Sequence, residues 1–372
     1  MLKMGLGRKT LTFILSLSVL LFFILNYIAM IILAYTGTMA GSSVPFYVIA
    51  IPIVFVSFLS PEYESYWIIF LVVIITIVLF FIVRDFLNWS WDLNKREISK
   101  EGKKFSTFTE LIVVLISFTY LTYFISMAIT NSSTPFGNPT SNVPTNYLLL
   151  TLLHAPVWEE IVYRALILGV PLYLISFRGK IPWYRAFIGG KFEINRTSII
   201  ILIISAFFFG SAHLVSWEPA KFPSAFFAGI ILGYLFLRYG IYMSIAGHFI
   251  IDFMGSYSYI DTPFWGAMAI ISSLVLLVWF AAGFPYYWYY LRDMFSIGKK
   301  RSDYYAQPFF NNPQYQNYYQ QNYQNYSQNQ QNYVLGYKII CPNCGFDQHR
   351  VLPDGRLQCL RCGTIFYYNY RR

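Results

Sequence analysis

Charged residues are scarce in this chain of 372 residues. Only 12% of the residues are charged, whereas 56% are hydrophobic. In soluble globular domains about a quarter of the residues are charged, so this composition excludes an ordinary soluble domain. It indicates instead a chain that crosses a membrane several times.

Eight apolar runs are long enough to cross a hydrocarbon core of about 30 Å. They lie near residues 11–34, 66–83, 107–129, 147–176, 197–215, 222–237, 241–256 and 264–290. The first run is too long for a signal peptide, so we expect it to be a retained anchor. A ninth run, residues 44–59, is short and contains two prolines, and it either spans, re-enters or is buried against its neighbours. The expected fold class is an all-α polytopic membrane protein with about eight transmembrane helices.

Basic residues are concentrated before the first run and in three loops, residues 84–104, 178–196 and 292–301. Because cytoplasmic loops carry an excess of lysine and arginine, this bias predicts a multi-pass protein of the cell membrane with both termini in the cytoplasm. All four basic segments lie on the cytoplasmic side only if residues 44–59 do not fully cross the bilayer. The net charge of +10 is then mostly a sign of topology, and nucleic acid is an unlikely partner.

Cysteine is also scarce, and all four cysteines lie near the C-terminus. They form two CxxC knuckles, Cys341 with Cys344 and Cys359 with Cys362. Two such knuckles can present four thiolates to one tetrahedral ion, which predicts a small β zinc ribbon that holds a structural Zn²⁺. The alternative, two disulfides, is disfavoured by the expected cytoplasmic position.

The segment before the ribbon has a biased composition. Residues 304–333 contain tyrosine, asparagine and glutamine but no charged residue, and we expect them to form a disordered linker. The ribbon at its end would recruit a cytosolic protein partner. The expected division of the chain is a transmembrane region at 1–106, a membrane core at 107–295, a linker at 296–336 and a zinc ribbon at 337–372.

Three charged residues interrupt the apolar run at 147–176. They are Glu159, Glu160 and Arg164, and each charge near the bilayer centre costs about 2.5 to 3.5 kcal/mol on insertion scales. Such a cluster predicts a paired, cavity-facing and functional site. Residues four apart share a helix face, so Arg164 can pair with Glu160, while Glu159 points about 100° away. The two carboxylates therefore need not share a task, and Arg164 would hold Glu160 ionised and fixed in place.

Histidine is rare, with four in the chain, and two of them belong to spaced pairs within apolar runs. His213 follows Phe209 by four residues, and His248 precedes Asp252 by four. Carboxylates and imidazoles that meet in a partly dry cavity suit the hydrolysis of an amide by water. The third histidine of the membrane part, His154, lies two residues before Pro156, where a kink is expected, and we expect it to be structural.

The three motifs, taken in this order, resemble those of the CPBP family of intramembrane proteases, which includes the type II CAAX prenyl endopeptidases and the Abi proteins. The family's EExxxR, FxxxH and HxxxN/D motifs fall on Glu159, Glu160 and Arg164, on Phe209 and His213, and on His248 and Asp252.

The resemblance implies an intramembrane endopeptidase, metal-dependent or glutamate-dependent, that cleaves a membrane-associated peptide or protein in contact with the lipid bilayer. Glu159 and His213 would position and activate the attacking water. His248 and Asp252 would stabilise the oxyanion or, together with Glu159 and His213, hold a catalytic divalent metal ion. Asp252 stands where the prenyl endopeptidases typically have asparagine, which favours a metal-bound or protonated state.

Two other functions stay open at the level of the sequence. An ion-coupled transporter would use the same carboxylates and histidines as a path for protons or cations, although no inverted repeat is visible. A non-catalytic membrane adaptor would use its membrane part as a scaffold and recruit a partner through the zinc ribbon.

Overall fold

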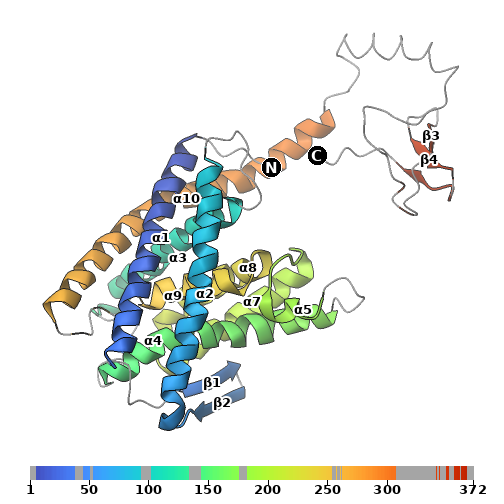
Figure 1. The fold of residues 1–372 in the computed structure, drawn as a ribbon. Coiled ribbons are helices and arrows are strands. Elements are labelled where there is room, and N and C mark those ends of the chain that lie inside the picture. The colour runs from blue at the N-terminus through green and yellow to red at the C-terminus, as the bar shows by residue number, and fades with distance from the viewer. Residues whose placement is uncertain are drawn as a thin grey trace. The chain divides into compact units, whose positions relative to one another are not determined.

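The structure is a computed structural model of the whole chain (Figure 1). It describes residues 6–37, 45–50, 53–93, 102–133, 144–175, 182–253, 257, 260, 262–306, 341, 343, 349–351, 356–360 and 362–366. The chain divides into two compact units, Met1–Phe295 and Ser296–Arg372.

The first unit is helical. Its long helices are α1 (Leu6–Tyr35), α2 (Glu64–Trp91), α3 (Gly102–Thr130), α7 (Arg196–Ala212), α8 (Phe222–Arg238) and the greater part of α10 (Pro263–Ala306). Six helical stretches in the described part of the chain are long and apolar enough to cross a membrane: Gly7–Tyr35, Pro61–Trp91, Lys103–Thr130, Arg196–Val215, Pro219–Arg238 and Pro263–Arg292. The structure thus confirms a mostly helical polytopic membrane protein.

Two of the eight expected spans are not among these six. Helix α9 (Ile241–Phe253) is apolar but has 13 residues, which is about 20 Å of helix and short for a crossing. The run at 147–176 is divided into α4 (Thr145–Glu159), the π-helix η2 (Glu160–Gly169) and α5 (Val170–Ile175). Both segments carry charged residues of the three motifs, so the departures from simple spans fall where polar groups must be placed.

The apolar run at 44–59 forms a β-hairpin in its described residues. Strands β1 (Pro45–Ala50) and β2 (Ile53–Phe58) pair antiparallel, with Tyr47 opposite Val56. Both strands are rich in β-branched and aromatic residues, which favour strands, and at six residues each they are too short to span a bilayer. Ile49 packs into a small core with Val162, Tyr163 and Phe209. Ile49 of β1 is thus buried against its neighbours, whereas β2 is largely exposed, with Phe55 at 60% and Phe58 at 63%.

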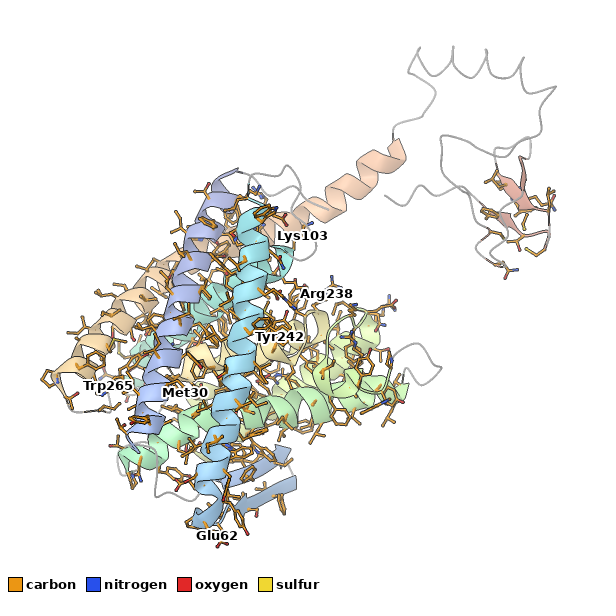
Figure 2. All side chains as sticks on the ribbon, in the orientation of Figure 1. Met30, Glu62, Lys103, Arg238, Tyr242 and Trp265 are labelled. Atoms are coloured by element: carbon orange, nitrogen blue, oxygen red, sulfur yellow. The ribbon has the colours of Figure 1, made fainter. Side chains whose placement is uncertain are left out.

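The main core joins α1, α2, α3, α4, α9 and α10. Met30 of α1 and Trp265 of α10 belong to it (Figure 2). Helices α7 and α8 pack so closely at Gly229 that an added Cβ would lie 2.8 Å from the Cα of Ala206. Small residues allow such close approach between membrane helices. This contact fixes α7, which carries Phe209 and leads directly into His213.

Two buried carboxylates tie the helices together away from the motifs. Glu110 of α3 receives Arg8 of α1 at 2.6 Å and the hydroxyl of Tyr290 of α10 at 3.0 Å. Asp85 of α2 accepts a hydrogen bond of 2.5 Å from the hydroxyl of Tyr242 of α9. Each acid is paired, as buried charges must be.

The second unit contains a small antiparallel sheet. Its strands are β3 (His349–Val351), β4 (Leu357–Cys359) and β5 (Ile365–Phe366), in the order β3-β4-β5. A small β unit at the C-terminus is what the spacing of the two cysteine knuckles predicts.

Candidate active site

The charged motif residues come from two consecutive helical segments, α4 and η2, and from helix α9, while His213 follows α7. Glu159 ends α4, and Glu160 and Arg164 lie in η2, where the backbone changes to π geometry. Pro156 lies inside α4 and cannot donate the usual helical hydrogen bond. Irregular turns of this kind are frequent at functional sites because they redirect side chains. Here the change of geometry falls between the two neighbouring glutamates.

Glu160 and Arg164 form a fully buried ion pair, as the spacing predicts. Both residues are 0% exposed, and Arg164 Nε lies 3.0 Å from Glu160 Oε2. The hydroxyl of Ser244 also donates to Glu160 Oε2. The guanidinium of Arg164 lies over the ring of Phe209 at 4.6 Å, which adds a cation–π contact. Glu160 thus has a cationic partner and a hydroxyl donor at its buried position.

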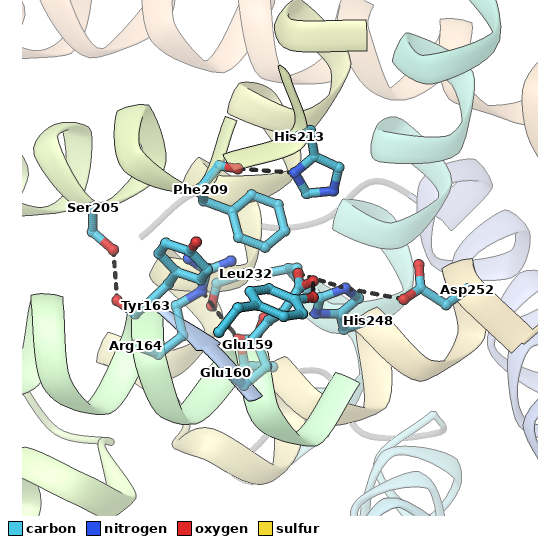
Figure 3. A network of polar contacts seen from close by, with 12 residues as sticks. Glu159, Glu160, Tyr163, Arg164, Ser205, Phe209, His213, Leu232, His248 and Asp252 are labelled. Atoms are coloured by element: carbon cyan, nitrogen blue, oxygen red, sulfur yellow. Dashed lines mark hydrogen bonds and ion pairs between the residues drawn. The ribbon is translucent and has the colours of Figure 1, made fainter. Parts of the chain in front are cut away.

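His248 of α9 connects the buried pair with the neighbouring acids (Figure 3). Its Nδ1 donates to Glu160 Oε1 at 2.8 Å, and its Nε2 lies 3.2 Å from Asp252 Oδ2. The same Nε2 is 3.7 Å from Glu159 Oε2. A neutral imidazole has only one N–H group. His248 can therefore donate a hydrogen bond to Glu160 and to Asp252 at the same time only when its ring is protonated.

His213 has a defined tautomer. It follows α7 at the start of the 3-10 turn η3 (His213–Val215), and its Nδ1 lies 2.9 Å from the carbonyl oxygen of Phe209. A carbonyl oxygen only accepts, so Nδ1 carries the hydrogen. In the neutral ring Nε2 is then an acceptor, which can take or orient a proton of water.

A cavity of about 480 Å³ joins these groups. Its polar lining includes Glu159, His213, Lys221, His248 and Asp252. The other lining residues are largely apolar. They come from β1, β2, α4, the end of α7 and the turn after it, and they include Ile49, Val56, Leu148, Leu152, Ala155, Ala212 and Val215. Glu160 and Arg164 do not line it and lie behind His248. The structure therefore brings the six sequence-predicted residues together in two layers, four at the cavity and two behind.

The polar groups at the cavity do not form a ready-made metal site. Among the residues that the structure describes, only the three described cysteines of the second unit bring metal-ligand atoms from three side chains within 4.8 Å of one another. Glu159, His213, His248 and Asp252 do not converge in this way, and both nitrogens of His248 already face carboxylates. The donor set as it lies serves proton transfer better than metal binding.

The described cysteines fit a tetrahedral metal centre. The Sγ atoms of Cys341, Cys359 and Cys362 lie within 4.8 Å of one another, and those of Cys341 and Cys362 are 3.6 Å apart. This is far longer than a disulfide bond of about 2.05 Å and near the separation of about 3.8 Å between two thiolates on one zinc ion. The predicted fourth ligand, Cys344, lies outside the described residues.

Sequence reasoning missed several polar residues at the cavity, among them Tyr47 and Lys221. Tyr47 of β1 donates a hydrogen bond from its hydroxyl to Glu159 Oε1, across 112 positions of sequence. Lys221 ends the 3-10 turn η4 (Pro219–Lys221), lines the cavity, and places Nζ 4.8 Å from the ring of Trp217. A lone lysine in an apolar region was a usable signal, whereas Tyr47 gave none because its run contains no charge.

His154 lies outside the cavity lining. Its Nδ1 accepts a hydrogen bond of 3.1 Å from Trp67 Nε1, and its ring packs against Phe46 and Trp158. Its place in this aromatic cluster agrees with the structural role expected for it.

Residues 141–254 match the family model of type II CAAX prenyl endopeptidase Rce1-like proteins. The matched segment contains all three motifs and excludes the β-hairpin and the cysteine unit. No curated protein matches the chain, and no solved structure does. The match confirms, for residues 141–254, the resemblance to the type II CAAX prenyl endopeptidases that the three motifs carry.

Proposed function

We propose that the chain is an intramembrane endopeptidase that hydrolyses a peptide bond of a membrane-associated protein or peptide. The match over residues 141–254 supports a CAAX-type intramembrane protease at the level of the family. The observation that carries the proposal is the common cavity, because Glu159, His213, His248 and Asp252 all line it. The proposed base Glu159, the acceptor nitrogen of His213 and the protonated ring of His248 thus face one cavity, which is large enough for part of a peptide.

Glu159 is the proposed general base. Among the described residues its Oε2 has no hydrogen-bond partner, and this oxygen is the one that faces His248. It would take a proton from water while His213 Nε2 holds the water in place. The water oxygen then bonds to the carbonyl carbon, and the carbonyl electrons move to the oxygen. General-base catalysis of this kind needs the base within hydrogen-bond reach of the water.

His248 is the proposed electrostatic partner of the oxyanion. Its protonated ring is fixed by Glu160 at one nitrogen and by Asp252 at the other, so its positive charge is in place before the reaction starts. A preorganised charge of this kind stabilises the developing negative charge without reorganisation. Glu159 then returns the proton to the leaving nitrogen, the carbonyl re-forms as the C–N bond breaks, and the new carboxyl group passes its remaining proton to the amine, so that a carboxylate and an ammonium group are released.

The Glu160–Arg164 pair acts behind this layer. Arg164 fixes Glu160 through their ion pair, and Glu160 in turn orients His248 through Nδ1. The pair therefore supports catalysis by setting the position and charge of the imidazole, without contact with the substrate.

Proteoliposomes that contain the purified protein test this function against ion transport. We expect new peptide ends from membrane-associated peptides, with and without a prenylated cysteine near the C-terminus, and no uptake of protons or cations. His213→Ala should lower the cleavage rate by about 10- to 1,000-fold, because a positioned proton acceptor is lost. Ion flux with intact peptides would support the transporter instead.

The six apolar helices and the family match indicate an integral membrane protein. The cytoplasmic position of both termini remains a proposal from the distribution of basic residues. A cytoplasmic second unit would be placed to recruit a cytosolic protein partner, which is the role we propose for it.

We further propose that Cys341, Cys344, Cys359 and Cys362 hold one structural zinc ion. A four-thiolate site is closed and would stabilise the fold of the second unit without taking part in hydrolysis. Metal analysis of the full chain should find one zinc per chain, and Cys359→Ser should lower this content. A zinc content unchanged by Cys359→Ser would contradict the assignment, and any stoichiometric metal left after removal of residues 304–372 would belong to the membrane cavity.

A further inference from the structure

The β1–β2 hairpin lies outside the segment that matches the family, yet it supplies a side chain to the proposed base. The hydroxyl of Tyr47 donates a hydrogen bond to Glu159 Oε1. Tyr47 also lines the cavity, together with its cross-strand neighbour Val56. The hairpin is therefore a wall of the cavity as well as a cover for the helix that carries Glu159.

Residues on both sides of Glu159 in the sequence also bind strand β1, close to the contact between Tyr47 and Glu159. Trp158 Nε1 donates to the backbone oxygen of Tyr47 at 2.7 Å, and the hydroxyl of Tyr163 donates to the backbone oxygen of Ile49 at 3.1 Å. The ring of Phe46 packs edge-on against that of Trp158, with ring centres 4.8 Å apart. Three residues of β1, Phe46, Tyr47 and Ile49, thus contact the segment that flanks the carboxylate, and the phenol has little freedom to leave it.

The contact makes the two oxygens of Glu159 unequal. Oε1 is occupied by the phenol, whereas Oε2 lies 3.7 Å from His248 Nε2 and has no hydrogen-bond partner among the described side and main chains. A carboxylate held at one oxygen cannot rotate freely, so it presents the other oxygen in a fixed direction. Burial, together with the nearby charge of Glu159, raises the pKa of Tyr47 well above its ordinary value, which keeps the phenol a donor.

We propose that Tyr47 is a positioning residue for Glu159 and that the β1–β2 hairpin is consequently part of the active centre. The inference rests on the proposed hydrolytic function. It assigns to Tyr47 the task of aiming the free oxygen of Glu159 at the attacking water. Residues that position a reactive group affect the rate of the chemical step more than they affect the binding of the substrate.

Tyr47→Phe removes the hydroxyl and keeps the ring, so it tests this role in the full chain. We expect kcat for peptide cleavage to fall by about 10- to 100-fold, the range for losing a hydrogen bond to a charged group. KM and the thermal unfolding temperature should stay unchanged. The matched control is Tyr242→Phe, which removes a phenol bonded to another buried carboxylate, Asp85, away from the cavity, and should keep the kcat of the unaltered protein.

A second readout does not depend on turnover. Dicyclohexylcarbodiimide reacts with protonated carboxyl groups in apolar surroundings, and mass spectrometry can follow its addition to Glu159. The Tyr47 hydroxyl covers Oε1 and favours the charged carboxylate, so Tyr47→Phe should label faster at Glu159, and Tyr242→Phe should not.

The two readouts separate the failure of this inference from the failure of the proposed function. If the unaltered protein cleaves peptides but Tyr47→Phe has the same kcat, or loses kcat only together with thermal stability, the positioning role is wrong and the hydrolytic function stands. If the unaltered protein cleaves nothing, the proposed function fails. Equal labelling of Glu159 in both proteins would overturn the Tyr47 contact in either case.

Discussion

Glu159→Gln should lower kcat for peptide hydrolysis by about 100- to 10,000-fold, the usual contribution of a positioned general base. Glutamine keeps the size of the side chain and an oxygen that can accept from Tyr47. It cannot take a proton from water, so the attacking hydroxide is not formed. Initial rates at several peptide concentrations separate kcat from KM, and KM should change little because the cavity keeps its shape.

The control for this variant is the stability of the fold. Glu159 is 7% exposed and lines the cavity, so its replacement by a neutral group of equal size should not lower the thermal unfolding temperature. A kcat equal to that of the unaltered protein would remove Glu159 from the mechanism. A collapse of thermal stability would show that its charge serves the fold.

Arg164→Met should lower the free energy of unfolding by about 3 to 5 kcal/mol, because breaking a buried ion pair leaves an uncompensated charge. Arg164 and Glu160 are both 0% exposed, so no solvent replaces the lost partner. The cation–π contact with Phe209 is lost in the same substitution. Reversible unfolding in mixed micelles measures the change.

The double variant Glu160→Gln, Arg164→Met is the matched control. It removes both charges, so most of the lost stability should return, while cleavage stays impaired because His248 loses its carboxylate partner. A single variant as stable as the unaltered protein would contradict the buried pair. A double variant less stable than the single one would show that Glu160 needs no cationic partner.

The contacts within each helical motif could be predicted from the sequence. Residues four apart share a helix face, and this rule anticipates the contact of Glu160 with Arg164 at 3.0 Å and that of His248 with Asp252 at 3.2 Å. It also separates Glu159 from Glu160, which lie in different layers of the site. These contacts are local, so the periodicity of one helix suffices to predict them.

Contacts between distant segments could not be predicted in this way. Tyr47 reaches Glu159 from a strand 112 positions earlier, and nothing in an apolar run says which partner it meets. The run at 44–59 is ambiguous because a short apolar segment suits a strand, a re-entrant loop or a buried helix equally well. The reduction to six candidate spans has a similar cause, since hydropathy does not show that α9 ends after 13 residues.

The cysteine unit shows the opposite case. Its spacing alone predicts the cluster, and the described thiols of Cys341, Cys359 and Cys362 do lie together. Metal-ligand geometry is so restrictive that two CxxC knuckles leave few other arrangements. The protein partner of the cysteine unit cannot be inferred in the same way, because recognition of a partner depends on surface side chains that no motif specifies.

The most direct test of the hydrolytic cavity is the fate of the water oxygen. A membrane peptide is incubated with the unaltered protein and with Glu159→Gln in water enriched in oxygen-18, and the products are weighed by mass spectrometry. We predict one labelled oxygen in the new carboxyl end for the unaltered protein, and little product for Glu159→Gln. Equal labelled product from both proteins, or no cleaved peptide from either, would contradict a hydrolytic site at Glu159.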